Sequence, residues 1–193
     1  YHNPETGKPE GYLSFRYPTE GDTGRVGEFL ANTPAAYRGL LSVLHYYGTQ
    51  VRRVRMNGPA DAPLPLYVMH NDLETEAGPL FMGRVVDCAA AFAALRPQTE
   101  ISGRLVLAVT DEHADWNQGK FAVNVEYGQV TATAVQDEPG VAVDIQTLSQ
   151  AYWGQPSLDQ LRAGGRLSVT DEDQYRLLAR LLPSTTCYLL DSF

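Results

Sequence analysis

The feature that most constrains the fold is a series of short segments with the alternating apolar pattern of β-strands, in the second half of the sequence. Residues 105–110 and 120–127 fit two strands joined by a polar loop, and residues 130–135 fit a third. Gly128-Gln129 predicts a two-residue type II′ hairpin connection, because glycine suits its first position. Residues 141–143 fit a fourth short strand. Strands joined by hairpins pair antiparallel, so the pattern predicts an antiparallel sheet.

Helical segments precede and follow these strands. An apolar stripe that starts at Val85 and ends before Pro97 predicts one helix. Three more helices follow the strands, each with a capping signal at its start. These signals are Asp144, Ser157 with Gln160, and Thr170 with Asp173. Because no alternating βαβ units are visible, the predicted fold class is α+β, with helices on one face of the antiparallel sheet.

The first half of the chain predicts a smaller arrangement. Residues 11–17 and 25–30 fit the two strands of a hairpin. Thr33 is a good N-cap and Gly48 suits the position after a helix, so together they bracket a helix at residues 34–47. A strand and a proline-rich segment follow, and the prolines permit at most a short helical turn.

A domain boundary is predicted where the composition changes. Residues 70–79, HNDLETEAGP, are polar and acidic and close with Gly-Pro. The predicted domains are therefore residues 1–81 and 82–193.

The charge balance excludes one large class of function. Lys and Arg number 15 against 23 Asp and Glu, which gives a formal charge of −8. A nucleic-acid binder needs a basic face, and the basic cluster Arg52, Arg53 and Arg55 lies in an acidic background. Residues 82–193 hold 8 basic and 14 acidic residues, so most of the negative balance belongs to the second half.

The ends and the cysteines of the chain indicate its compartment. No apolar run reaches the roughly 20 residues needed to span a bilayer, and the start does not resemble a signal peptide, so no membrane association and a cytoplasmic location are predicted.

Cys88 and Cys187 lie in apolar stretches and predict buried thiols. The last ten residues, STTCYLLDSF, predict a strand or a buried terminus. The start at Tyr1 rather than Met indicates the C-terminal piece of a longer protein.

Common catalytic and metal-binding patterns do not occur in the sequence. There is no nucleophile elbow, zinc-protease motif or phosphate-binding glycine loop, and the four histidines share no ligand spacing. Asp111, Asp115, Asn117 and Gly119 resemble part of a calcium loop that has no closing Glu, so turn formation is the favoured role. No metal site is predicted.

One hexapeptide fits the pyrophosphate loop of acetyl-CoA-dependent GNAT enzymes literally. Arg55-Met-Asn-Gly-Pro-Ala60 matches the pattern R/Q-x-x-G-x-G/A, whose backbone N–H groups point at phosphate oxygens. Pro59 removes one of those donors, and the later prolines prevent a proper helix from following. The favoured interpretation is an ordinary strand-to-turn segment, so this chain is predicted to bind no acetyl-CoA itself.

Several segments, in order and spacing, resemble the C-terminal half of the enhanced-intracellular-survival (Eis)-like acetyltransferases. They are GYLSFRY, VGEFLANTPAAYRGLLSVLHYYG, PLFMGRVVDCAAAFAAL, AYWGQPSLDQLRAGGRL and the terminal Phe193. The resemblance implies that residues 1–81 are the later part of a degenerate GNAT-like domain and that residues 82–193 resemble sterol carrier protein 2. It also implies that the catalytic, acetyl-CoA-binding GNAT domain is a missing partner, so that this chain alone is inactive.

The resemblance assigns the chemistry to the end of the chain. It implies a bacterial N-acetyltransferase that transfers an acetyl group from acetyl-CoA to a cationic amine of aminoglycoside, polyamine or lysine type. The α-carboxylate of Phe193 would act as base or orient the cation, and Asp191 is a second candidate that would bind substrate. An α-carboxyl has a pKa of about 3.5, so burial or a relay through water would be needed for it to act as a base.

Two other functions remain open from the sequence. The sheet could carry a lipid or another small apolar ligand, with a lining that would otherwise be plain core. That lining is Leu105, Leu107, Phe121, Val123 and Val125. Alternatively the chain could be an assembly module, since the relatives form homo-oligomers, commonly hexamers.

Overall fold

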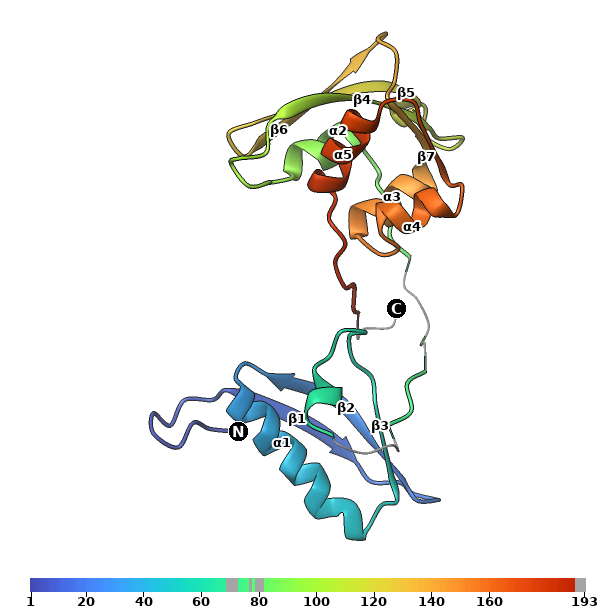
Figure 1. The fold of residues 1–193 in the computed structure, drawn as a ribbon. Helices are drawn as coiled ribbons and strands as arrows, with labels where there is room; N and C mark the ends of the chain where they lie inside the picture. Colours follow the sequence, from blue (N-terminus) through green and yellow to red (C-terminus); the bar gives the residue numbers. More distant parts are fainter. Residues whose placement is uncertain (69–72, 77, 79–81, 190–193) are drawn as a thin grey trace. The chain divides into compact units, whose positions relative to one another are not determined.

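A computed structural model describes residues 1–68, 73–76, 78 and 82–189 (Figure 1). The chain forms two units, the first made of Tyr1–Leu80 with the residues from Tyr188 onward, and the second of Phe81–Cys187. The domain limits 1–81 and 82–193 stay a prediction. The grouping differs from them in placing Tyr188 with the first unit.

The first unit contains a three-stranded sheet in the order β1-β2-β3. Strands β1 (Gly11–Arg16) and β2 (Thr23–Ala31) pair antiparallel, which confirms the predicted hairpin. The register of this pair shifts between Ser14 and Phe15. Strand β3 (Arg53–Met56) pairs parallel with β2, and helix α1 (Pro34–Tyr46) connects the two. This is a βαβ crossover, so the prediction that no such unit exists is wrong here.

Helix α1 begins as predicted and ends differently. The Thr33 hydroxyl accepts the N–H of Ala36 at 3.1 Å, and Pro34 occupies the first turn. After Tyr46 the chain tightens into the 3₁₀-helix η1 (Tyr47–Thr49). Gly48 therefore lies inside η1 and does not directly follow α1, so that part of the prediction is wrong. A second 3₁₀-helix, η2 (Leu64–Leu66), confirms that the proline-rich segment forms only a short helical turn.

The second unit is built on a five-stranded sheet in the order β6-β5-β4-β7-β8. Its strands are β4 (Gly103–Thr110), β5 (Gly119–Glu126), β6 (Gln129–Val135), β7 (Val141–Asp144) and β8 (Leu167–Val169). The β4–β7 pair is parallel and the other pairs are antiparallel, so the predicted all-antiparallel sheet is wrong at one pairing. Strand β7 does not return beside β6 but joins the sheet beyond β4, which a pattern of successive hairpins could not indicate.

The β5–β6 turn corrects a second detail. Glu126 pairs with Gln129, so Tyr127 and Gly128 are the two central residues. Their φ angles are +49° and +74°, and two positive values define a type I′ turn rather than type II′. The sequence prediction was one residue out of position, because glycine is favoured in both turn types.

Four α-helices accompany this sheet: α2 (Cys88–Ala94), α3 (Ile145–Trp153), α4 (Leu158–Ala163) and α5 (Glu172–Leu181). The predicted caps Asp144 and Ser157 are confirmed by hydrogen bonds from the backbone. Helix α5 is capped by Asp171 rather than Thr170, whose hydroxyl instead donates to the Pro139 carbonyl at 2.8 Å. None of the helices that the structure describes has the length and apolar character needed to cross a bilayer.

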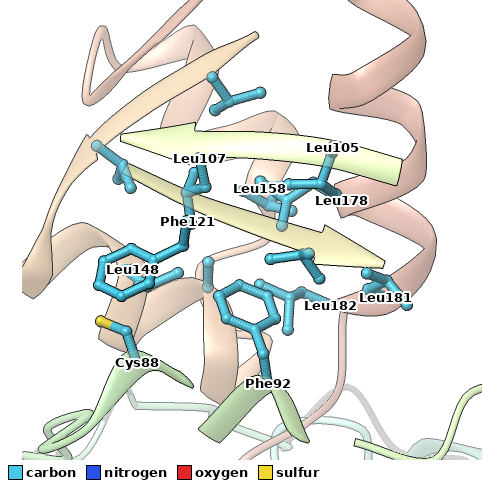
Figure 2. Close-up of a cluster of buried hydrophobic side chains, with 14 of the residues drawn as sticks. Cys88, Phe92, Leu105, Leu107, Phe121, Leu148, Leu158, Leu178, Leu181 and Leu182 are labelled. Carbon is cyan, nitrogen blue, oxygen red and sulfur yellow. The ribbon is translucent and has the colours of Figure 1, made fainter. Parts of the chain in front are cut away.

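The helices cover one face of the sheet, which confirms the α+β class (Figure 1). Side chains from alternate strand positions meet side chains of the helices in a continuous core (Figure 2). The largest fully buried side chains in it include Phe92, Leu105, Leu107, Ile145, Leu148 and Leu178. A short 3₁₀-helix, η3 (Asp115–Asn117), lies in the loop between β4 and β5.

Replacing Phe92 with alanine should destabilise the second unit by about 3–5 kcal/mol, because it leaves a cavity where a ring 1% exposed now packs. Both tryptophans, Trp116 and Trp153, belong to the second unit, so denaturant unfolding followed by their fluorescence reports on this unit. Met82→Ala, at a fully exposed side chain, is the control and should change little. Equal stability of the two variants would contradict the assignment of the core.

Candidate functional site

The two residues predicted to carry the chemistry, Phe193 and Asp191, lie outside the described residues. What the structure describes is the path toward them, residues 182–189, named the C-terminal segment below. This segment follows α5 and contains neither helix nor strand. Leu182 is buried, but the residues after it are exposed or half-exposed. The predicted strand or buried terminus is therefore wrong for the described part of the tail.

The C-terminal segment is held by the end of helix α3. Thr185 donates its N–H to the Gly154 carbonyl at 3.2 Å and its hydroxyl to the Trp153 carbonyl at 2.9 Å. Carbonyls at a helix C-terminus have no partner within the helix, so they are available to such a segment. Gly154 has φ +77°, and a Cβ there would lie 2.6 Å from the Thr185 nitrogen. The approach therefore requires glycine.

Cys187 continues this contact. Its N–H donates to Gln155 Oε1 at 3.3 Å, and its thiol lies 2.7 Å from the Trp153 carbonyl oxygen. Cys187 is half-exposed, so the prediction of a buried thiol is wrong for it and confirmed for Cys88, which is 1% exposed. Burial, with the charge of Asp111, raises the pKa of Cys88 to about 12. That thiol is therefore protonated at neutral pH and is no nucleophile.

Tyr188 belongs to the first unit. Its hydroxyl donates to the backbone carbonyl of Asn57 at 3.0 Å, directly after strand β3. Burial raises the pKa of Tyr188, so the phenol keeps its proton and remains a donor at neutral pH. No local pattern in the sequence indicates this contact, because 131 positions separate the two residues.

A buried polar network lies where the chain leads into the second unit. Asp111 is 4% exposed and accepts two hydrogen bonds from Arg84 Nη2, at 2.8 and 2.7 Å. Asn117 Nδ2 and the His113 N–H donate to the same carboxylate, each at 3.0 Å. Burial alone would raise the pKa of Asp111, but these bonds outweigh it and lower the pKa to about 2.

The same network fixes the segment before helix α2. Asn117 Oδ1 accepts the N–H of Cys88 at 2.9 Å, and Asn117 Nδ2 also donates to the Val86 carbonyl at 3.0 Å. Trp116 Nε1 donates to that carbonyl at 2.8 Å. Two of the residues that resemble a calcium loop, Asp111 and Asn117, therefore bind the protein itself, and the carboxylate of Asp111 accepts four hydrogen bonds. The sequence pointed to these positions but not to Arg84, their partner from before α2.

The described residues contain no group of three or more His, Cys, Asp or Glu side chains placed to hold a metal ion. The hexapeptide Arg55–Ala60 makes contacts within the chain through a side chain and a carbonyl, and neither of these uses a backbone N–H group of the loop. Arg55 Nη2 binds Glu76 Oε2 at 2.7 Å, and the Pro59 carbonyl accepts the Ala62 N–H at 3.0 Å. Over residues 57–68, all of which are described, the chain forms turns and η2. The residues present therefore do not fit the diphosphate of acetyl-CoA, which needs free N–H groups at a helix N-terminus.

The side chains considered as a carrier lining form part of the packed core. Leu105, Leu107, Phe121, Val123 and Val125 are each at most 6% exposed. Leu105, Leu107 and Phe121 meet the helices' side chains in Figure 2. Two surface pockets of this unit, of about 440 and 360 Å³, are lined by other residues, largely polar in the first and mixed in the second.

Comparison with known families identifies both parts of the chain. Residues 88–190, just over half of the sequence, match the sterol carrier protein domain, and the chain belongs to this family. Residues 1–85 match the acetyltransferase (GNAT) domain. The chain thus combines a GNAT acetyltransferase domain with a domain of the sterol carrier type.

Solved structures with the same fold include GNAT proteins. A probable N-acyltransferase from Enterococcus faecalis has a TM-score of 0.89 at 22% identity and covers all of this chain and 49% of its own length. A GCN5-related N-acetyltransferase from Anabaena variabilis has a TM-score of 0.84 at 22% identity. The match covers 97% of this chain and 48% of that structure's chain. Eis1 from Mycobacterium abscessus has a TM-score of 0.69 at 25% identity, and the match covers 96% of this chain and 49% of the Eis1 chain.

This chain therefore spans about half the length of the solved structures that it matches. Among curated proteins no significant match was found.

Asp111→Asn should remove an acid-dependent part of the stability. The lowered pKa means that the folded chain binds this proton less well than the unfolded chain, where the pKa is 3.8. The stabilisation is complete above about pH 4 and is lost as the pH falls toward about 2. Urea midpoints from pH 7 to pH 2, followed by tryptophan fluorescence, should fall less steeply in this window for the variant. Asp115→Asn in the same loop is the control and should lose stability with pH as the parent does. If the urea midpoint of the Asp111 variant fell as steeply as that of the control, the network would not be the cause of the acid-dependent loss of stability.

Gly154→Ala should release the C-terminal segment. The new Cβ meets Thr185 and the Pro183 carbonyl, the latter at 2.7 Å, and alanine at φ +77° costs about 1–2 kcal/mol. Gly165→Ala is the matched control, because φ is +69° there and nothing lies within 4 Å. Carboxypeptidase should shorten the Gly154 variant several-fold faster than the Gly165 variant. Equal digestion rates would show that α3 does not hold the tail.

Proposed function

We propose that this chain is the C-terminal region of an Eis-like, acetyl-CoA-dependent N-acetyltransferase that acts on a cationic amine of aminoglycoside, polyamine or lysine type. It supplies scaffold, part of the substrate pocket and the terminal carboxylate of Phe193. The observation that carries the proposal is the pair of family matches in one chain, a GNAT domain followed by a sterol carrier protein domain. Eis1 supports it, since the likeness extends over 96% of this chain.

The acetyl-CoA site is assigned to a partner domain rather than to this chain. The described residues do not fit the diphosphate, because Pro59 has no N–H to donate, no α-helix follows in residues 57–68, and Arg55 pairs with Glu76. The chain corresponds to about half of the solved structures, which leaves room for a catalytic GNAT domain in the complete protein. Acetyl-CoA would supply the acetyl group there.

The role proposed for the terminal carboxylate follows from its chemistry. An amine substrate is an ammonium ion at neutral pH and must lose a proton before it can attack a carbonyl. A carboxylate close to the ammonium attracts it and, when desolvated or linked through a water, can accept that proton. Tyr188, held on Asn57, is five residues from the end, so chain geometry limits the reach of Phe193 to roughly 18 Å from Tyr188.

The substrate class is supported by charge. Residues 82–193 hold 14 acidic and 8 basic residues, so the half that ends in the carboxylate attracts cations. Asp191 is proposed as a second contact to the substrate. The complete protein is proposed to be a cytoplasmic homo-oligomer, with the hexamer common in the relatives as the first candidate, and to bind neither nucleic acid nor membrane.

The test uses the complete protein, with the upstream GNAT domain present. Converting the Phe193 carboxylate to an amide should lower kcat/KM for amine acetylation by about 100-fold or more, because the proton acceptor is removed. Deleting Phe193 should also lower it, because the terminal carboxylate then belongs to Ser192 and ends one residue short. The chain of residues 1–193 by itself should show no acetyl transfer.

Phe193→Leu is the matched control, because it keeps the terminal carboxylate and changes only the side chain. It should retain most of the activity. Unchanged turnover after amidation would refute the role of the carboxylate. Acetyl transfer by the isolated chain would refute the assignment of the cofactor site to another domain.

A further inference from the structure

Four arginines share one face of the three-stranded sheet in the first unit. Arg16 on β1 lies directly opposite Arg25 on β2, and Arg25 lies directly opposite Arg55 on β3. Residues paired in this way point to the same face, with neighbouring strands about 4.8 Å apart. Arg53, two residues before Arg55, adds a fourth guanidinium to the same face. These four residues are named the arginine row.

The arginine row lies on the face that α1 leaves open. The other face packs under the helix, where Gly24 and Val26 are buried beside Phe15. A Cβ at Gly24 would lie 2.7 Å from Phe15 Cε2, which shows how closely that face is packed. All four arginines are exposed. The row therefore presents its charge to the surroundings rather than to the core.

The row is not neutralised within the described part of the chain. Arg55 Nη2 binds Glu76 Oε2 at 2.7 Å, and both side chains remain more than half exposed. No ion pair joins Arg16, Arg25 or Arg53 to any residue that the structure describes. Like charges directly opposite one another destabilise a sheet. The arrangement lowers the stability of the isolated unit unless an anion binds to it.

The same face is apolar at its other end. Tyr12 on β1 pairs with Leu30 on β2, and each is 50% exposed. The Tyr12 hydroxyl donates to Glu28 Oε2 at 2.7 Å, which leaves the ring on the surface. Exposed tyrosine and arginine next to an aliphatic residue are the composition typical of protein–protein interfaces. The open face thus combines a cationic part with an apolar part, and the exposed carboxylate of Glu28 lies on it beside Tyr12.

We infer that this open face is a docking surface for an acidic polypeptide segment, whose carboxylates bind the arginine row while an apolar residue contacts Tyr12 and Leu30. Glu76 is the observation that favours a carboxylate: among the described residues, the anionic group that binds the row is a glutamate of this chain's own acidic segment. Guanidinium groups bind carboxylates through paired, charge-assisted hydrogen bonds. The breadth of the face, from Tyr12 to Arg16 along β1, suits a polypeptide rather than a single small ion.

The test is fluorescence anisotropy of a labelled hexaglutamate peptide with the chain of residues 1–193. The peptide should bind, and raising the salt from about 50 to about 300 mM should weaken binding. The double variant Arg16→Glu/Arg25→Glu should bind about tenfold more weakly or worse, because two reversed charges repel the peptide. This variant should fold at least as well as the parent, since the carboxylate introduced at position 25 would face Arg55 across the strands; a melting curve checks this.

The control is Arg38→Glu/Arg180→Glu, which changes the net charge equally but leaves the row intact; both residues are exposed and lie outside it. Binding close to that of the parent supports a local docking surface. Equal loss in both double variants, or no binding by the parent, overturns the inference. Two further results would assign the row to another occupant and also overturn it. These are tighter binding of tripolyphosphate than of the peptide, or self-association that the row variant abolishes.

Discussion

The second unit depends on the burial of one apolar sheet face. Strands β4 and β5 each contribute alternate side chains to it, and helices α2, α3 and α5 supply the opposing layer (Figure 2). Hydrophobic burial is the dominant favourable contribution to folding, and it requires close packing rather than mere proximity. The same packing explains why the interior is a core and not a ligand cavity: Phe92, Leu148 and Leu178 occupy the space beneath the sheet.

Polar contacts then fix the segments that the core does not order. The chain before α2 is held through Arg84, Asp111 and Asn117, whose hydrogen bonds satisfy buried groups that would otherwise destabilise the fold. The chain after α5 is held in a similar way by the carbonyls at the end of α3. In both cases irregular backbone is kept in place by partners that are distant in sequence. The proposed function relies on the second of these contacts, since a terminal group can act only if the tail that carries it is ordered.

The sequence could predict what depends on local patterns. Strand positions, the helix at Pro34–Tyr46, and the caps Thr33 and Asp144 all follow from periodicity and from side chains that bind nearby N–H groups. It could not predict partners: the parallel β2–β3 and β4–β7 pairs and the Tyr188–Asn57 bond join segments with no local signature. For the candidate site, the resemblance to a family selected Phe193 and Asp191. The structure describes the C-terminal segment that leads to these two residues, but the residues themselves lie outside the described part of the chain.

Composition and pattern by themselves predicted an acidic α+β chain in two parts and argued against nucleic acid as a partner. They also identified the cluster Arg52, Arg53 and Arg55, but as neighbours along one strand. Only the tertiary structure decided that Arg53 and Arg55 share a face with Arg16 and Arg25, because strand register is set by pairing across the sheet. The physical reason is general. Propensity and capping act over a few residues, whereas register, crossover and packing depend on which distant segments bury their apolar faces together.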